Sequence, residues 1–233
     1  MNPNEEIIRI VNRFEIAVSN FGQSCFDLQA NEKAFQAWYA SYVIQEFGIS
    51  HVYREIHLWK SHLRELIPNS DVLGKYLSGN ELFPDVSVSW YPNIDARHSN
   101  TRNDSFQNAG AFLNQFSIVS ELKVTGSTLR STPISSIIND IMKLYIFSAA
   151  HKEFNNENDK IFMLKCYMVI LDNAKNNDGF KNSYTRDRIS SKLRKLKNIW
   201  KSDVQLPNVV LINPKKYSTN VSILRNLNEW TSF

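Results

Sequence analysis

The chain has 233 residues, of which 42% are hydrophobic and 12% aromatic, and its net charge is +4. A chain of this size can bury one full α/β core, so we expect a single domain over residues 1–233. No apolar run reaches the ~18 residues of a membrane span. The two cysteines, Cys25 and Cys166, have no zinc-ligand spacing and favour neither a disulfide framework nor a zinc site. We therefore expect a cytoplasmic protein with no membrane partner.

The chain begins with two segments of helical periodicity. Apolar residues recur at steps of three and four from Glu5 to Phe21 and again from Asn31 to Phe47. Gly48 follows the second segment, where a helix C-cap is expected. Both segments are amphipathic, so we expect two helices that pack against a sheet.

The period then changes to two, which is typical of strands. We expect strands at His51–Trp59, at Val86–Trp90 and at Phe116–Val124. Residues 68–80 and 95–108 are rich in turn-forming and polar residues, so they predict an irregular connection and a long loop.

The second half of the chain predicts a further helix and buried strand. Pro133 is suited to the first position of a helix that ends near Phe154. The apolar run Ile161–Leu171 is typical of a strand buried on both faces. Thr185–Lys201 predicts a basic helix, and Val209–Ile212 a last short strand. The core order is therefore helix, three strands, helix and strand.

Charged residues lie in or beside three of the expected strands. Glu55 lies in the first strand, Asp85 directly precedes the second, and Glu121 and Lys123 lie in the third. A buried carboxylate is costly unless it is compensated, and a divalent cation shared by several carboxylates is one such compensation. The pattern therefore indicates a site.

Each motif also has a purely structural explanation. Asp85 follows a proline and can be a turn residue that opens a strand. Glu121 and Lys123 can belong to a cross-strand ion pair on a solvated face. The occurrence of all the motifs in one chain favours a metal site over these separate explanations.

Pro84-Asp85 followed by Glu121-Leu122-Lys123, on the second and third strands of an αβββαβ order, resembles the PD-(D/E)xK nuclease superfamily. The resemblance covers roughly residues 31–171. It leaves an N-terminal helix in 1–30 and a basic helix with a C-terminal extension in 181–233. It implies an α/β fold that is restriction-endonuclease-like, with a mixed central sheet flanked by helices.

The resemblance implies metal-dependent hydrolysis of phosphodiester bonds. Asp85, Glu121 and the carbonyl of Leu122 would bind Mg²⁺, for which Mn²⁺ would substitute. Glu121 and Lys123 are two apart in a strand and share a face, so Lys123 would lie beside the metal and the attacking water. Lys123 would orient or deprotonate that water, or stabilise the phosphate.

Members of the superfamily often have a further acid on the first strand. Glu55 lies near that place, while Glu46 at the end of the preceding helix is a rival. The expected catalytic residues are therefore Glu55, Asp85, Glu121 and Lys123.

Basic and polar residues outside the motifs are candidates for nucleic-acid contacts. The segment from Lys181 to Lys201 has Asp187 as its one acid, so its helix can follow a phosphate backbone or simply be a solvated face. The resemblance also places the loops at the strand ends around the active site. The candidates are Arg97, Arg102, Ser127, Thr128, Arg130, Lys143, Arg188, Lys192 and Lys195.

We therefore expect a Mg²⁺-dependent endonuclease for DNA, double-stranded in the simplest case, with a restriction-type or phage-related role. A homodimer would supply the two sites that double-strand cleavage needs. A nuclease for RNA or for branched or single-stranded DNA is an alternative. A non-catalytic nucleic-acid-binding or interaction protein with the same fold is an alternative of another class, although Asp85, Glu121 and Lys123 are all intact.

Overall fold

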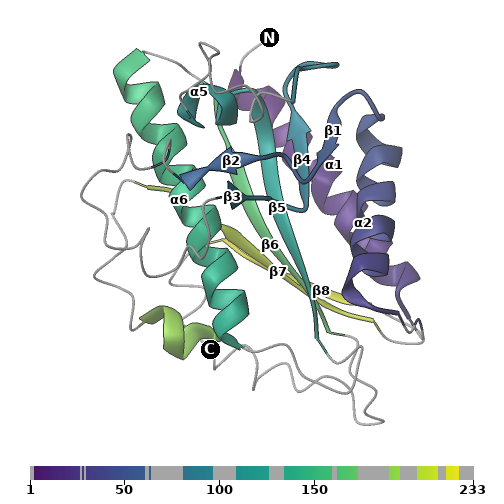
Figure 1. Ribbon diagram of the computed structural model, residues 1–233. Helices are drawn as coiled ribbons and strands as arrows, with labels where there is room; N and C mark the ends of the chain where they lie inside the picture. The colour runs from purple at the N-terminus through teal and green to yellow at the C-terminus, as the bar shows by residue number, and fades with distance from the viewer. Residues whose placement is uncertain are drawn as a thin grey trace.

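The computed structural model describes residues 3–26, 28, 30–60, 63, 81–96, 109–125, 134–158, 162–172, 189–194, 204–214 and 219–225. In these residues a six-stranded mixed sheet lies between two layers of helices, as Figure 1 shows. None of the described helices is both long enough and apolar enough to cross a bilayer.

The elements of the described residues fall into two sheets and the helices around them. The helices are α1 (Pro3–Ser24), α2 (Glu32–Phe47), α5 (Ala109–Leu113) and α6 (Ile134–Asn158). The strands of the main sheet are β1 (Val52–Arg54), β4 (Val86–Ser89), β5 (Phe116–Thr125), β6 (Lys165–Asp172), β7 (Asn208–Asn213) and β8 (Asn220–Leu224). The second sheet is a two-stranded ribbon of β2 (Leu58–Trp59) and β3 (Glu81–Leu82).

The main sheet has the strand order β1-β4-β5-β6-β7-β8. β1, β4 and β5 are antiparallel neighbours, whereas β5, β6 and β7 run parallel and β8 is antiparallel to β7. Helix α6 connects β5 to β6, as a parallel pair requires. The sheet is therefore mixed and α/β in class, as the sequence predicts.

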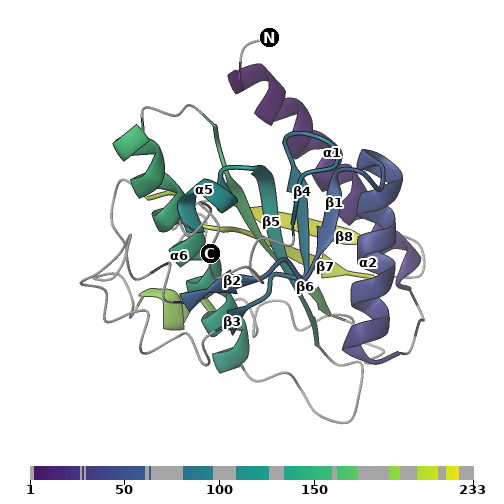
Figure 2. The ribbon, with the colours of Figure 1, turned by 45° about the horizontal axis from the view of Figure 1, so that its top comes forward.

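Strand alternation in β5 divides the core into two layers. Ile118 and Leu122 pack with residues of α1 and α2, whereas Val119 packs with residues of α5 and α6. Glu121 and Lys123 share the parity of Val119, so they belong to the face that α6 covers. Figures 1 and 2 show these layers, and in both views the β2–β3 ribbon lies beside α6.

Helix α2 is capped at both ends, and the C-cap is the one that its sequence predicts. The side chain of Asn31 accepts a hydrogen bond from the N–H of Ala34 at 2.9 Å. At the other end, Gly48 has a φ of 80° and its N–H donates to the carbonyl of Ile44 at 2.7 Å. The expected helix and its C-cap are both confirmed.

The strand expected at His51–Trp59 is wrong in its second half. β1 ends at Arg54, and Glu55 adopts a positive φ of 50°, which ends the extended conformation. The chain then leaves the main sheet, and Leu58 pairs with Leu82 in the ribbon. The period-two pattern continues across the break because the ribbon is also extended, so the pattern alone does not separate two strands in two sheets.

The remaining expectations differ mainly at the ends of elements. Within the described part of the expected apolar run at Ile161–Leu171, only Lys165 onward is strand. Of the expected basic helix, residues 189–194 are described and helical, and Ile189 and Leu193 are buried. The connection at 68–80 and most of the 95–108 loop lie outside the described residues. Helix α5 and strands β3 and β8 are short elements that the sequence did not predict.

Candidate active site

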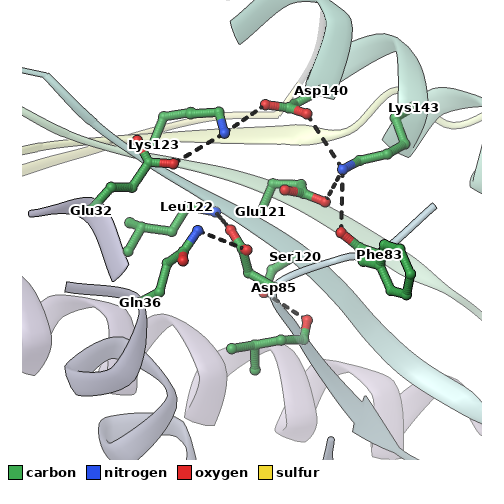
Figure 3. Close-up of polar contacts among 11 residues, drawn as sticks. Glu32, Gln36, Phe83, Asp85, Ser120, Glu121, Leu122, Lys123, Asp140 and Lys143 are labelled. Carbon is green, nitrogen blue, oxygen red and sulfur yellow. Dashed lines mark hydrogen bonds and ion pairs between the residues drawn. The ribbon is translucent and has the colours of Figure 1, made fainter. Parts of the chain in front are cut away.

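The acids of the sequence motifs lie at the point where β4 begins beside β5. Val86 pairs with Ser120, and the two strands are antiparallel. Asp85, one residue before Val86, therefore lies level with Glu121, one residue after Ser120. Beyond this point β5 has no partner among the described strands on its β4 side, which leaves room for side chains from α2 and α6. Figure 3 shows both helices contributing residues there.

The carboxylate of Asp85 is fixed on both of its oxygens. Oδ2 accepts a hydrogen bond from the backbone N–H of Leu122 at 2.7 Å, and Oδ1 accepts one from the side-chain amide of Gln36 at 2.9 Å. Burial raises the pKa of Asp85, and the Leu122 N–H acts in the opposite direction. The expected role of the Leu122 carbonyl as a metal ligand stays a prediction, whereas its N–H has a defined structural role.

Glu121 is buried, with 2% of its surface exposed, and forms an ion pair with the ammonium of Lys143 on α6. Burial raises the pKa of Glu121 well above its usual range, and the nearby carboxylates of Asp85 and Asp140 raise it further. Lys143 opposes this shift because its positive charge favours the ionised carboxylate. Glu121 is therefore a carboxylate whose charge depends on a nearby cation.

Lys123 lies between two further acids. Its Nζ is 3.2 Å from Glu32 Oε1 on α2 and 3.2 Å from Asp140 Oδ2 on α6. Burial lowers the pKa of Lys123, but Asp140, Glu32 and Glu121 together outweigh burial and leave the pKa raised. A lysine with a raised pKa stays protonated at neutral pH. This favours an electrostatic or hydrogen-bonding role for Lys123 over that of a general base.

These side chains form one carboxylate–lysine cluster. Its members are Glu32, Asp85, Glu121, Lys123, Asp140 and Lys143. When all are ionised, four carboxylates against two ammonium groups leave two negative charges in a largely buried volume. Such an excess is expensive in a low-dielectric region, and either a proton on a carboxylate or a divalent cation would reduce it.

The donor set fits one kind of metal site and not another. In the part of the chain that the structure describes, no three His, Cys, Asp or Glu side chains converge as a ready-made metal cage. Mg²⁺, however, is commonly bound through one or two carboxylates and keeps several waters. Asp85 and Glu121 supply two carboxylates of this kind. The cluster therefore fits Mg²⁺ or Mn²⁺ with a partial water shell, and it does not fit zinc.

A buried hydrogen-bond chain attaches α2 to the sheet beside the cluster. The hydroxyl of Tyr39 donates to Ser120 Oγ at 2.9 Å, and Ser120 Oγ donates to the carbonyl of Val86 at 2.9 Å. Burial raises the pKa of Tyr39, so its hydroxyl remains a donor at neutral pH. The chain fixes the distance of α2 from β4 and β5, and so the positions of Glu32 and Gln36.

Three polar residues of the site escaped the sequence analysis. Glu32 and Gln36 are four residues apart and continue the buried stripe of Tyr39 and Val43 toward the start of α2. Asp140 similarly lies one turn before Lys143 on α6. In α2 the sequence does contain a signal for these residues, because Glu32 and Gln36 lie on the same side of the helix as the buried Tyr39 and Val43.

Neither candidate for the additional acid belongs to the carboxylate–lysine cluster, although the backbone of Glu55 lies near that of Asp85. Glu55 follows Arg54, which pairs with Val86, but Glu55 is exposed and lies outside β1. It takes no part in the contacts that join the cluster. Glu46 lies near the C-terminal end of α2, about 21 Å along the helix axis from Glu32. Among the described residues, Glu32 and Asp140 are the further acids that contact Lys123.

The residues expected to contact nucleic acid lie in different surroundings, and most of them lie outside the described residues. Lys143 lies inside the cluster, with 12% of its side chain exposed, and not on an open surface. Lys192 is exposed. The other candidates lie outside the described residues, namely Arg97, Arg102, Ser127, Thr128, Arg130, Arg188 and Lys195.

Comparisons of the chain with protein families, with curated proteins and with solved structures found no match. The geometry of the cluster is therefore the basis for an inference about function.

Proposed function

We propose that the chain is a metal-dependent endonuclease of restriction-endonuclease-like fold that hydrolyses DNA phosphodiester bonds. The observation that carries the proposal is the convergence of Asp85, Glu121 and Lys123 at one point of the sheet, although 35 residues separate Asp85 from Glu121 in the chain. The order of α2, β1, β4, β5, α6 and β6 along the chain, with all four strands in the main sheet, supports the fold assignment.

In the proposed mechanism, Asp85 and Glu121 are the residues that would hold the metal, through their carboxylate oxygens. The Leu122 N–H and the Gln36 amide fix the orientation of Asp85 before any ligand arrives. Mg²⁺, when bound, would lower the pKa of a coordinated water and neutralise charge on the phosphate. The chain's own part is to place two carboxylates and one ammonium at fixed positions around the scissile bond.

The role of Lys123 follows from its charge. A protonated ammonium donates hydrogen bonds and cannot accept a proton. Lys123 would therefore donate a hydrogen bond to the oxygen of the attacking water and so orient it, or stabilise negative charge on the phosphate. Glu32 and Asp140 hold the ammonium from two sides and act as positioning residues.

The direct test is cleavage of supercoiled plasmid by the purified chain with Mg²⁺ or Mn²⁺, beside an EDTA sample. Asp85→Asn, Glu121→Gln and Lys123→Met should each abolish nicking, whereas Arg9→Gln, which alters an exposed residue of α1 outside the cluster, should not. Single-stranded DNA, branched DNA and RNA are tested in parallel to define the substrate. Absence of cleavage of every substrate by folded protein in both metals would favour a non-catalytic binding protein.

Cleavage of both strands at one place needs two active sites, so we propose that the chain acts on double-stranded DNA as a homodimer. Light scattering of the protein with and without DNA tests this part separately. A monomer that linearises plasmid only after nicking would limit the proposal to single-strand cleavage.

A further inference from the structure

Lys143 has an unusual position for a lysine. It projects from α6 and its ammonium forms an ion pair with Glu121, the most buried acid of the cluster. The same Nζ donates to the carbonyl of Phe83 at 3.4 Å. Lys143 therefore neutralises the same carboxylate that the proposed function assigns to the metal, and Figure 3 shows its ammonium directed at Glu121.

A second acid lies within reach of the same ammonium. Asp140 Oδ1, one helical turn before Lys143 on α6, is 3.4 Å from Lys143 Nζ. The two residues are three apart on one helix, so Asp140 stays within reach of the ammonium if the ammonium moves away from Glu121. Lys143 thus has two carboxylate partners, and it can give up one without leaving its charge unpaired.

The charge balance of the cluster favours an exchange. When all four carboxylates are ionised and both lysines are in place, two negative charges remain in the cluster, and a divalent cation would cancel them. The Lys143 ammonium contacts Glu121 Oε1, and a cation on the same carboxylate would be repelled by this second positive charge. Withdrawal of Lys143 toward Asp140 would therefore make the binding of a metal to Glu121 more favourable.

We propose that Lys143 is an exchangeable counter-ion that occupies Glu121 in the metal-free protein and is displaced toward Asp140 when a divalent cation binds. The inference rests on the proposed function for the identity of the metal ligands. It adds a regulation of that site, because the affinity for metal is then set by a competition between the cation and a side chain of the same chain.

The test is the affinity for Mn²⁺ of the folded protein, measured by calorimetry and by electron paramagnetic resonance without substrate. Lys143→Met removes the competing charge, and Lys143→Gln removes it while keeping a hydrogen-bond donor for Glu121. Both should bind Mn²⁺ about tenfold more tightly or better, which is the usual effect of one nearby charge. In EDTA both should melt at a lower temperature than wild type, and Mn²⁺ should raise their melting temperature by more.

Lys123→Met is the matched control, because it removes a positive charge from the same cluster without removing the ion pair of Glu121. The proposal requires a clearly larger gain in affinity for the Lys143 variants than for Lys123→Met. Equal gains in affinity would mean that any positive charge in the cluster has the same effect, and this result would overturn the proposal. If neither Lys143 variant folds, NMR of lysine labelled at the ε carbon in wild-type protein replaces them, and a buried lysine resonance unmoved by saturating Mg²⁺ would overturn it.

The outcomes separate this inference from the proposed function. Wild type that cleaves DNA and binds Mn²⁺, with unchanged or weaker binding in the Lys143 variants, would overturn the counter-ion role alone. Tight Mn²⁺ binding that appears in the Lys143 variants of a protein that cleaves nothing would support the counter-ion role and contradict the nuclease. No binding in wild type or in any variant would overturn both.

Discussion

The backbone N–H of Leu122 donates to Asp85 Oδ2 at 2.7 Å, so the acid that precedes β4 is bonded to the strand that contains Glu121 and Lys123. The bond takes the place of a strand-to-strand hydrogen bond at the point where β4 no longer covers β5. It joins the two halves of the motif through one side chain. The geometry of the site and the end of the β4–β5 pairing therefore have the same structural cause.

This relationship predicts different results for two substitutions of Asp85. Asp85→Ala leaves the Leu122 N–H and the Gln36 amide without their acceptor, so it should lower the free energy of unfolding by about 1–3 kcal/mol. Asp85→Asn keeps one acceptor oxygen for Leu122, and the loss should be smaller. Urea unfolding of the metal-free proteins measures both. Equal losses in the two variants would mean that the hydrogen bond contributes little, whereas Mn²⁺ binding should be lost in both.

The contacts of Lys123 predict which additional acid matters for activity. Glu32→Gln removes one of the two carboxylates that hold the ammonium, so it should lower the cleavage rate by about tenfold to a hundredfold, as loss of a positioning group commonly does. Glu55→Gln alters an exposed residue outside the cluster and should leave the rate within about twofold. Single-turnover cleavage assays of the two variants decide between the positions.

A reversed result, with Glu55→Gln inactive and Glu32→Gln active, would restore the acid that the sequence favoured. A positioning role for Glu32 also has a signature of its own. Glu32→Gln should lower the cleavage rate less in a Lys123→Arg background than in wild type. The reason is that a guanidinium can bind Asp140 with two hydrogen bonds.

The comparison between sequence and structure explains why the acids of the motifs were found and their neighbours were not. Asp85, Glu121 and Lys123 stand out because each interrupts or adjoins an apolar strand, where period-two alternation also fixes their face. Glu32 and Asp140 lie on helices, where charged residues are common and ordinarily solvated. Their role depends on how α2 and α6 pack across the sheet, which no local pattern contains.

The assignment of Glu55 to a strand is wrong, whereas its expected catalytic role stays a prediction. Its surroundings alternate like a strand on both sides, so the sequence placed it in β1 beside the site. The positive φ of 50° at Glu55 is a tertiary outcome, since the chain must turn there to start the β2–β3 ribbon. Glutamate has no special preference for that conformation, and therefore the residue gave no sign of the break.

The packing of α1 on the sheet predicts a sensitive glycine. A Cβ at Gly22 would lie 2.6 Å from Ile212 Cγ2 in β7, and a β-branched side chain in a strand has little freedom to move. Gly22→Ala should therefore destabilise the protein by about 1–3 kcal/mol, despite the higher helix propensity of alanine. Chemical denaturation measures the loss.

A double-mutant cycle isolates the contact. In an Ile212→Ala background the methyl group that Gly22→Ala adds would have room, so this substitution should cost less there than in wild type. A cost that is the same in both backgrounds would place the strain elsewhere.

His151 predicts the direction of one pH effect on stability. It is buried in α6, and burial lowers its pKa to about 4, below the value near 6.5 of an exposed histidine. Between these two values the unfolded chain binds a proton that the folded chain does not, so the free energy of unfolding rises with pH across this window. Acidification from pH 6.5 to pH 4 should therefore cost up to about 3 kcal/mol through this residue.

Glu121 acts in the opposite direction, since its raised pKa makes the folded protein bind a proton more readily than the unfolded chain. The measurement is therefore a difference between wild type and His151→Gln, with urea unfolding in EDTA at several pH values. The variant should lose less stability than wild type between pH 6.5 and pH 4, because glutamine does not titrate. Parallel pH curves for the two proteins would show that His151 is protonated equally in both states, and that the chain does not shield it from water.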